Sequence, residues 1–270
     1  MSGRLTLKSH FGIVIVSGII VSAGLYLLPK TVVTDDDAGQ SVVQNQSTTT
    51  SSHPAPALSD EQLLELDSIR GANPGEVDRA LAVSQYFLSI DRYDSSAVYA
   101  GRYADVANTE LAWLDAGDKY YQAFSLSLNP LEKDKLAEKT REVYNKVLEL
   151  NPANLHAKTN MAMTYVSSSS PMQGILMLRQ VLDVNPRYVP AIMSMGALSM
   201  QSGQYDKAVL RFQDVLKIDP SNVNAKIGLA YSLIELNKKE EARQLLNEVL
   251  KENLDEVLKT EVARTLESLN

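Results

Sequence analysis

Apolar positions recur along residues 110–256 at helical spacing, and prolines interrupt them at a fixed interval. Pro152, Pro186 and Pro220 are spaced 34 residues apart, and each follows a short apolar stretch such as residues 215–218. A proline cannot continue a helix, and it disfavours the helical conformation of the residue before it. A fixed period of 20 to 50 residues is typical of stacked supersecondary units.

Each period contains two helical patterns with a turn between them. After the turn at 201–205, Ala208, Phe212 and Val215 recur three and four residues apart, which places them on one stripe of a helix. The pattern predicts a helix, a turn, a second helix and a stop. Because one such pair cannot bury both of its faces, neighbouring pairs are expected to stack.

The pattern resembles the tetratricopeptide repeat (TPR) family, in which a Trp, a Leu-Gly, a Tyr, an aromatic residue, an Ala and a Pro recur. The resemblance covers roughly 77–256, with Gly174 at a position where the family has Ala. The second half of the unit at 110–154 comes late, which implies an insertion of about eleven residues. The residues that match the motif, and to which it assigns structural roles, are Trp113, Gly117, Tyr120, Pro152, Pro186, Gly196, Tyr205, Ala208, Phe212 and Pro220.

The expected fold class is all-α: a TPR superhelical solenoid of stacked helix-turn-helix pairs, with one transmembrane helix at the N-terminus. A short leading helix is predicted over 60–76 and a capping helix, with an apolar stripe and a polar outer face, over 257–270. Between them, five units are expected at 77–109, 110–154, 155–188, 189–222 and 223–256.

Three local features are also predicted. The runs Asn73-Pro74-Gly75-Glu76 and Asn129-Pro130-Leu131-Glu132 both favour a helix start, with Asn as the cap and Pro in the first position. The second start leads into a long charged helix that ends near residue 150. On this helix Glu142 and Lys146 stand four residues apart, a spacing that suits an ion pair.

Residues 11–28 form an uninterrupted apolar run without charge. Eighteen residues span ~27 Å as a helix, close to the ~30 Å hydrocarbon core of a bilayer. Arg4 and Lys8 precede the run, so residues 1–10 are expected on the cytoplasmic side and the rest of the chain outside, as a single-pass protein of the inner membrane with periplasmic or extracytoplasmic repeats. Residues 29–59, rich in Ser and Thr, are expected to be a disordered linker.

A cleaved signal peptide is the alternative interpretation of the same run. Val21-Ser22-Ala23 is tolerable as a cleavage site, although residues 25–28 continue the apolar stretch past it. Both interpretations export the repeats.

Composition argues against several function classes. The net charge is −7 and no run is basic, which argues against nucleic acid as a partner. The chain has no Cys, and its three histidines, at positions 10, 53 and 156, are far apart in the predicted layout. No phosphate loop, dinucleotide fingerprint or nucleophile elbow is present. Neither an enzyme nor a cofactor or metal site is expected.

The resemblance implies that the first helices of the units line a concave groove that binds peptides or protein segments. Seven of the eight methionines fall between 161 and 200, and flexible Met side chains suit adaptable apolar contact, as with an amphipathic helix. The alternative is that these methionines only pack between helices. Counting from the repeat starts, the candidate groove residues are Met163, Val166, Met193, Ala197, Met200, Ile227, Tyr231 and Ile234, with Leu111, Leu114, Asp118, Tyr121, His156 and Thr159 on the same face of the earlier units.

The TPR members that bind chaperone C-termini clamp a carboxylate with Lys, Asn and Arg, of which only Asn160 corresponds here. A carboxylate clamp is therefore not expected. The favoured function is a membrane-anchored scaffold or adaptor for the assembly of an envelope protein complex, similar to bacterial TPR proteins of cytochrome c maturation or the Sec translocon. The alternatives are a secreted or periplasmic client-binding module and an organelle import receptor with cytosolic repeats. The sequence does not set the oligomeric state.

Overall fold

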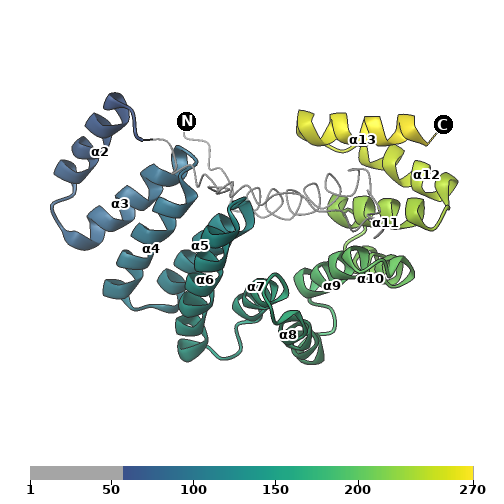
Figure 1. Cartoon of the computed structure of the whole chain (residues 1–270), viewed down its shortest axis with the longest axis horizontal. Helices are drawn as coiled ribbons and strands as arrows, with labels where there is room; N and C mark the ends of the chain where they lie inside the picture. Colours follow the sequence, from purple (N-terminus) through teal and green to yellow (C-terminus); the bar gives the residue numbers. More distant parts are fainter. Residues whose placement is uncertain (1–56, 270) are drawn as a thin grey trace, which may run out of the picture.

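The helices of this protein form an open arc. The computed structural model describes residues 57–269, and within that range it contains twelve helices and no strand. Figure 1 shows the helices following one another around the arc, with α2 at one tip and α13 at the other. The predicted membrane span at 11–28, and the linker as far as residue 56, lie outside the described residues. None of the helices that the structure describes is both long and apolar enough to cross a membrane.

The helices are arranged as one leading helix, five consecutive pairs and a final single helix. The leading helix is α2 (Asp60–Ala72) and the final one is α13 (Glu256–Ser268). The five pairs between them are α3 (Glu76–Ser89) with α4 (Tyr93–Ala107), α5 (Glu110–Leu126) with α6 (Pro130–Leu150), α7 (Leu155–Val166) with α8 (Pro171–Val184), α9 (Val189–Gln201) with α10 (Tyr205–Ile218), and α11 (Val223–Glu235) with α12 (Lys239–Val249).

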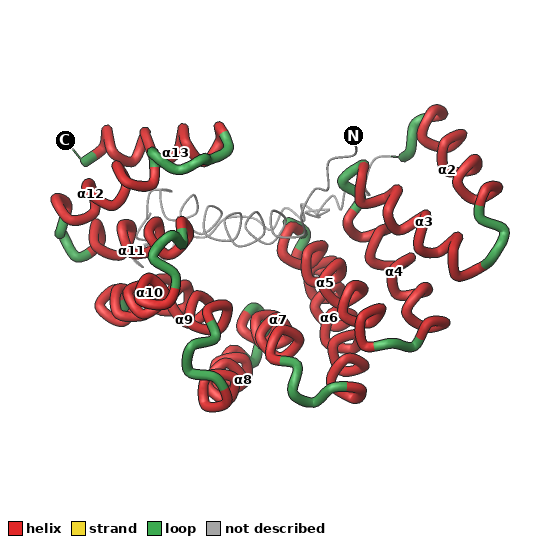
Figure 2. The backbone as a smooth tube through the Cα atoms, turned by 180° about the vertical axis from the view of Figure 1, so that it is seen from behind, coloured by secondary structure: helices red, strands yellow, loops and turns green. Residues whose placement is uncertain are grey.

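The first helices of successive pairs lie on the inner side of the arc. Helix α7 contacts both α5 and α9, and α9 in turn contacts α11. In Figures 1 and 2, α7, α9 and α11 face the inside of the curve, while α8, α10 and α12 lie toward the outside. The arc therefore has an inner face built mainly from first helices, and this is the face on which the sequence places its candidate groove.

Phe212 on α10 holds three helices together. Its side chain is fully buried. A Cβ atom built on Gly196 of α9 would lie 2.7 Å from its ring, and one built on Gly228 of α11 would lie 2.6 Å from it. Real Cβ atoms do not approach this closely, so the two glycines allow both inner helices to pack directly on the aromatic ring. This packing joins one helix pair to the next.

The pair α7–α8 uses a different close contact. A Cβ on Gly174 would clash with the carbonyl oxygen of Ala162 and would lie 2.7 Å from Cγ2 of Val166. The backbone of α8 therefore runs against the backbone of α7, which leaves no room for the alanine that the repeat pattern has at this position. This contact explains why the chain has Gly174 where the repeat pattern has Ala.

The pair α5–α6 is longer than the others. Helix α5 has 17 residues and α6 has 21, compared with 13 and 14 in α9 and α10. The extra residues of the unit at 110–154 therefore lengthen both of its helices. The side-chain Oδ1 of Asn129 caps α6 by accepting from the backbone N–H groups of Leu131 and Glu132. That start agrees with the sequence prediction.

Two other local predictions were wrong. Glu142 pairs with Lys139 at 2.6 Å and Lys146 pairs with Glu149 at 3.0 Å, so the expected pair between Glu142 and Lys146 does not form. Three-residue spacing on a helix brings side chains together as effectively as four-residue spacing.

The helix start expected at Asn73 is also displaced. Asn73 stands at the end of α2, where its side-chain Nδ2 donates to the carbonyl of Ile69, and Gly75 precedes α3 as its cap residue. The guanidinium of Arg79 donates to the carbonyls of Asn73 and Pro74. These bonds satisfy carbonyl groups at the end of α2, so the asparagine serves the preceding helix.

The remaining motif residues occupy core or turn positions. Trp113 and Tyr120 of α5 and Ala208 of α10 are buried, and Tyr205 begins α10. The three prolines that set the period are exposed and follow the ends of α6, α8 and α10; they are Pro152, Pro186 and Pro220.

Candidate protein-binding face

The predicted groove residues belong to three neighbouring inner helices. Helix α7 carries Met163 and Val166, helix α9 carries Met193, Ala197 and Met200, and helix α11 carries Ile227, Tyr231 and Ile234. Met193 is only 5% exposed and Ile227 only 4%, and both belong to the core around Phe212. The expectation that these two side chains are open to a partner was therefore wrong. They lie beneath the inner face.

Two further candidates are partly occupied by contacts within the chain. Val166 packs against Gly174 of α8. The hydroxyl of Tyr231 lies 3.1 Å from Oγ1 of Thr265, which ties α11 to α13, and burial raises the pKa of Tyr231. Tyr231 therefore contributes to the joint between the last pair and the final helix.

Four candidates remain as partly exposed, uncharged side chains. They are Met163 on α7, Ala197 and Met200 on α9, and Ile234 on α11. Met163 packs beside the core of α7 and α8, while Met200 and Ile234 pack at the margin of the core around Phe212. Because each keeps part of its surface accessible, these four residues are the apolar patch of the inner face.

A polar cluster lies at the neighbouring part of this face, where α5, α6 and α7 meet. Oδ1 of Asp118 accepts a hydrogen bond from the Tyr144 hydroxyl at 2.6 Å and lies 2.6 Å from Nε2 of His156. The side-chain amide of Asn160 donates to the Tyr144 oxygen at 2.9 Å. These four residues (Asp118, Tyr144, His156 and Asn160) are called the Asp118 cluster below. They join three helices through side chains.

The charge of Asp118 and burial act together on the surrounding phenols. Burial, followed by the negative charge of Asp118, holds the pKa of Tyr144 well above its usual value. Burial is also the main cause that raises the pKa of Tyr121 to about 12, and both burial and Asp118 raise the pKa of Tyr188. All three phenols are neutral hydrogen-bonding groups at physiological pH.

Sequence reasoning placed Asp118 and His156 on the inner face but did not connect them. The two side chains contact each other directly, and Tyr144, which belongs to a second helix and is fully buried, donates its hydroxyl to the same Asp118 oxygen. The ring passes beneath Gly117, where a Cβ would lie only 2.6 Å from it. Gly196 and Phe212 in the unit at 189–222 stand in the same relation as Gly117 and Tyr144 in the unit at 110–154, so the repeat itself was a signal for this contact.

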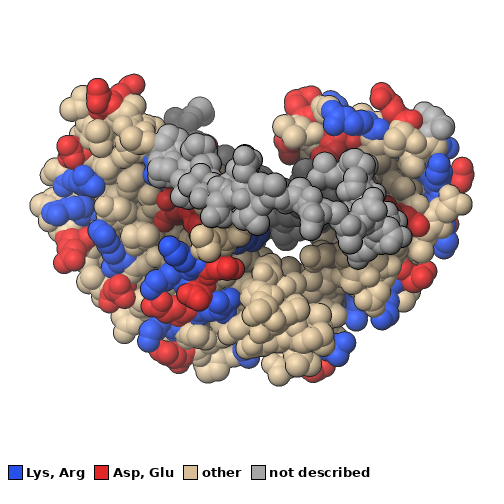
Figure 3. Space-filling model, viewed as in Figure 1, with Lys and Arg blue, Asp and Glu red and all other residues tan. Residues whose placement is uncertain are grey.

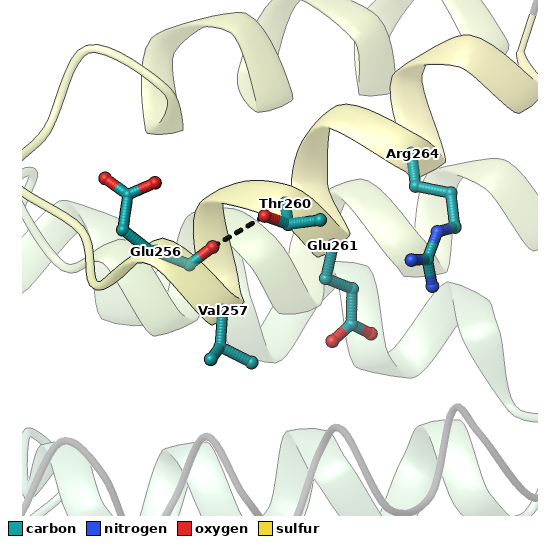
Figure 4. A pocket seen from close by; sticks show the side chains of 5 residues that line it. All are labelled: Glu256, Val257, Thr260, Glu261 and Arg264. Carbon is teal, nitrogen blue, oxygen red and sulfur yellow. Dashed lines mark hydrogen bonds between the residues drawn. The ribbon is translucent and has the colours of Figure 1, made fainter.

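Among residues 57–269, no group of three or more His, Asp or Glu side chains is placed to hold a metal ion. A shallow pocket at the far end of the arc is lined by residues of α13 alone (Figure 4). Its one hydrogen bond between lining residues runs from the Thr260 hydroxyl to the backbone carbonyl of Glu256. The lining side chains lie along one exposed helix face and do not point toward a common reacting atom.

The outer face also carries apolar side chains. Met172 and Leu176 on α8 are 59% and 52% exposed. Figure 3 shows that the surface over α7 and α8 is largely free of charged side chains. These two residues provide a natural comparison for the apolar patch of the inner face, because they resemble it chemically but belong to α8, a helix toward the outside of the arc.

Comparisons with known proteins support the repeat assignment. Residues 199–261 match a family model described as tetratricopeptide repeat. No curated protein matches the chain. Of the solved structures, a thermophilic TPR protein of Thermus thermophilus is 16% identical over 72% of this chain and 98% of its own, with a TM-score of 0.52.

Two other solved structures cover different shares of the chain. A chain of the APC/C hetero-tetramer Cut9-Hcn1 is 13% identical over 78% of this chain and 39% of its own, with a TM-score of 0.54. The MamA protein is 15% identical over 65% of this chain and 91% of its own, with a TM-score of 0.45. At such identities a likeness shows the fold alone. The family match identifies a tetratricopeptide repeat over residues 199–261, and the likeness to the Thermus thermophilus and Cut9-Hcn1 structures shows an all-α fold of stacked helix pairs.

Proposed function

We propose that this chain is a non-enzymatic interaction module that binds a protein or peptide segment on the inner face of its arc. The observation that carries the proposal is the apolar patch: three inner helices that contact one another in turn each carry partly exposed, uncharged side chains. TPR solenoids supply extended concave surfaces of this kind for binding.

The chemistry of the patch fits an apolar partner surface. Helix α9, at the centre of the patch, contains no charged residue. Met163 and Met200 have flexible, polarisable side chains that can adapt to a bound surface, and Ala197 between them leaves space for one. A patch with these properties suits the apolar face of an amphipathic helix.

The proposal extends to a membrane anchor. The run at 11–28 is long and apolar enough to span a bilayer, and Arg4 and Lys8 before it favour a cytoplasmic N-terminus. The module would then be held at the outer side of the inner membrane, where it would act as a scaffold in the assembly of an envelope complex. The alternative is a module released by signal cleavage that delivers clients in the periplasm. The mass of the mature N-terminus distinguishes the two.

A third arrangement, an organelle import receptor with cytosolic repeats, predicts the opposite topology. Protease treatment of sealed membranes tests it, because repeats on the outside of the compartment would be digested without detergent.

Affinity purification of the full-length protein from native membranes tests the binding proposal. The test variant carries Ala197→Glu and Met200→Glu, two changes at partly exposed positions that leave the buried Met193 in place. The matched control carries Met172→Glu and Leu176→Glu on the outer face of α8. We expect a stoichiometric partner that is lost from the inner-face variant and retained by the control. A partner retained by the folded inner-face variant would overturn the proposal.

A further inference from the structure

The geometry points to the Asp118 cluster as a subsite for a cationic side chain, Lys or Arg, of the polypeptide bound on the inner face. This inference rests on the proposed function, to which it adds the chemistry of one contact. The apolar patch would contact the hydrophobic part of the partner, and the Asp118 cluster would contact a positive charge near that part.

The carboxylate of Asp118 is held by one oxygen and open at the other. Oδ1 takes the hydrogen bonds from Tyr144 and His156, whereas Oδ2 accepts none from the residues that the structure describes. The side chain of Asp118 remains 32% exposed. An oriented, partly exposed carboxylate, with one oxygen that accepts no hydrogen bond from the described residues, can accept a charge-assisted hydrogen bond from a ligand.

Lys119 on α5 and Arg141 on α6 have other partners. Lys119, the next residue, forms an ion pair with Asp115. Arg141 lies over the ring of Tyr165, 4.9 Å from its centroid, and near the hydroxyl of Thr164. Over residues 57–269, no Lys or Arg forms an ion pair with Asp118; its partners are the His156 imidazole and the Tyr144 hydroxyl. A ligand Lys or Arg would add an ammonium or guanidinium partner that no described residue supplies.

Two tyrosines feel the charge of Asp118, and aromatic rings near the carboxylate favour a cation over a neutral ligand. Tyr121 stands three residues after Asp118, on the same side of α5. Tyr188, just before α9, lies close enough for the charge of Asp118 to affect it. Phenol rings attract cations through their faces. The net charge of −7 also favours the approach of a positive segment.

A purely structural role is the competing explanation. The cluster links α5, α6 and α7, and such a link needs no ligand. A structural link predicts that Asp118→Asn alters stability but that no ligand cation binds at this place. The two explanations therefore differ in a binding measurement.

The experiment uses the full chain in detergent and three small probes. They are the Nα-acetyl N-methylamides of lysine, arginine and norleucine; norleucine matches the lysine side chain without its ammonium group. NMR follows the side-chain amide of Asn160 and the ring of His156 during each titration. Asp118→Asn keeps the oxygen that accepts from Tyr144 and His156 but removes the charge. Asp206→Asn, at an exposed position in the first turn of α10, removes the same charge elsewhere.

We expect saturable shifts with the lysine or the arginine derivative, and the difference between these two identifies the preferred cation. Norleucine should leave the signals unchanged. Asp118→Asn should weaken cation binding by roughly tenfold or more, the size of a lost charge-assisted contact, whereas Asp206→Asn should not. Absent shifts, equal shifts with norleucine, or equal losses in both variants would overturn the inference.

The result of this titration can be told apart from the result of the affinity purification that tests the proposed function. If the partner is lost from the Ala197→Glu, Met200→Glu variant but no cation binds at Asp118, the inner face binds its partner without this subsite. If cations bind at Asp118 but the partner survives the inner-face substitutions, the subsite exists and the proposed binding surface is wrong.

Discussion

The ring of Tyr144 occupies the space where a side chain of Gly117 would stand. A Cβ on Gly117 would lie 2.6 Å from Cε1 of Tyr144. The absence of that atom lets the fully buried ring pass under α5, and its hydroxyl reaches Oδ1 of Asp118 at 2.6 Å. A packing contact inside one helix pair thereby sets the position of a carboxylate on the inner face.

Gly117→Ala should disturb both the packing and the cluster. The added methyl group cannot fit without a shift of the Tyr144 ring, and such overpacking costs about 1–3 kcal/mol. Urea unfolding should show this loss, and the side-chain amide signal of Asn160 should move. The matched control is Gly71→Ala on α2, where a Cβ would meet no atom within 4 Å. A Gly117→Ala protein as stable as this control would contradict the packing account.

Phe212→Ala should be among the most destabilising single changes in the chain. The fully buried ring contacts α9 through Gly196 and α11 through Gly228, so truncation opens a cavity between two helix pairs. Removal of a buried Phe side chain costs about 3–5 kcal/mol. Phe212→Leu, which keeps most of the volume, should cost less. Equal losses for the two variants, measured by urea unfolding, would argue against a cavity as the cause.

Gly174→Ala should destabilise the α7–α8 pair although alanine is the residue that the repeat pattern favours here. The new Cβ would clash with the carbonyl oxygen of Ala162, and a backbone atom cannot rotate away as a side chain can. We expect a loss of about 1–3 kcal/mol in urea unfolding. A neutral or stabilising effect, as helix propensity alone predicts, would show that the two backbones are farther apart than described.

Acid should weaken the turn between α10 and α11. Hydrogen bonds from the Ser221 hydroxyl and the Asn222 amide to the Asp219 carboxylate hold the pKa of Asp219 below its usual value. A carboxyl whose folded pKa is depressed stabilises the fold above its unfolded pKa of about 4. That contribution disappears as the pH falls through the lower folded pKa.

Asp219→Asn tests this pH dependence. The variant should be less stable than the parent at pH 7, and the difference in melting temperature between them should shrink toward pH 3. A difference that stays constant over this range would mean that ionisation of Asp219 is not responsible.

The sequence predicts the helix pairs better than the inner face. The 34-residue period locates turns because prolines and apolar stripes are local signals, and α5, α7, α9 and α11 begin at Glu110, Leu155, Val189 and Val223, where the repeat counting starts its units. Counting positions along a helix identifies the side on which a residue lies. Such counting does not show how deeply a side chain is buried, because burial depends on the neighbouring helices.

Met193 and Tyr144 illustrate that difference. Met193 lies on the inner side of α9, as counted, but packs down against the core around Phe212 and is buried. Tyr144 belongs to a second helix, where the repeat pattern assigns a packing role, yet its hydroxyl reaches the inner face. Both outcomes follow from contacts between different helices, and the spacing of residues along one helix does not specify those contacts.

Site-specific photocrosslinking in native membranes tests the central claim most directly. A photoreactive phenylalanine analogue is placed at position 197 on the inner face, or at position 176 on the outer face, of the full-length protein. We expect a discrete crosslinked partner from position 197 and none from position 176. A partner crosslinked from position 176 but not from 197 would contradict the central claim and move the binding surface to the outer side of the arc.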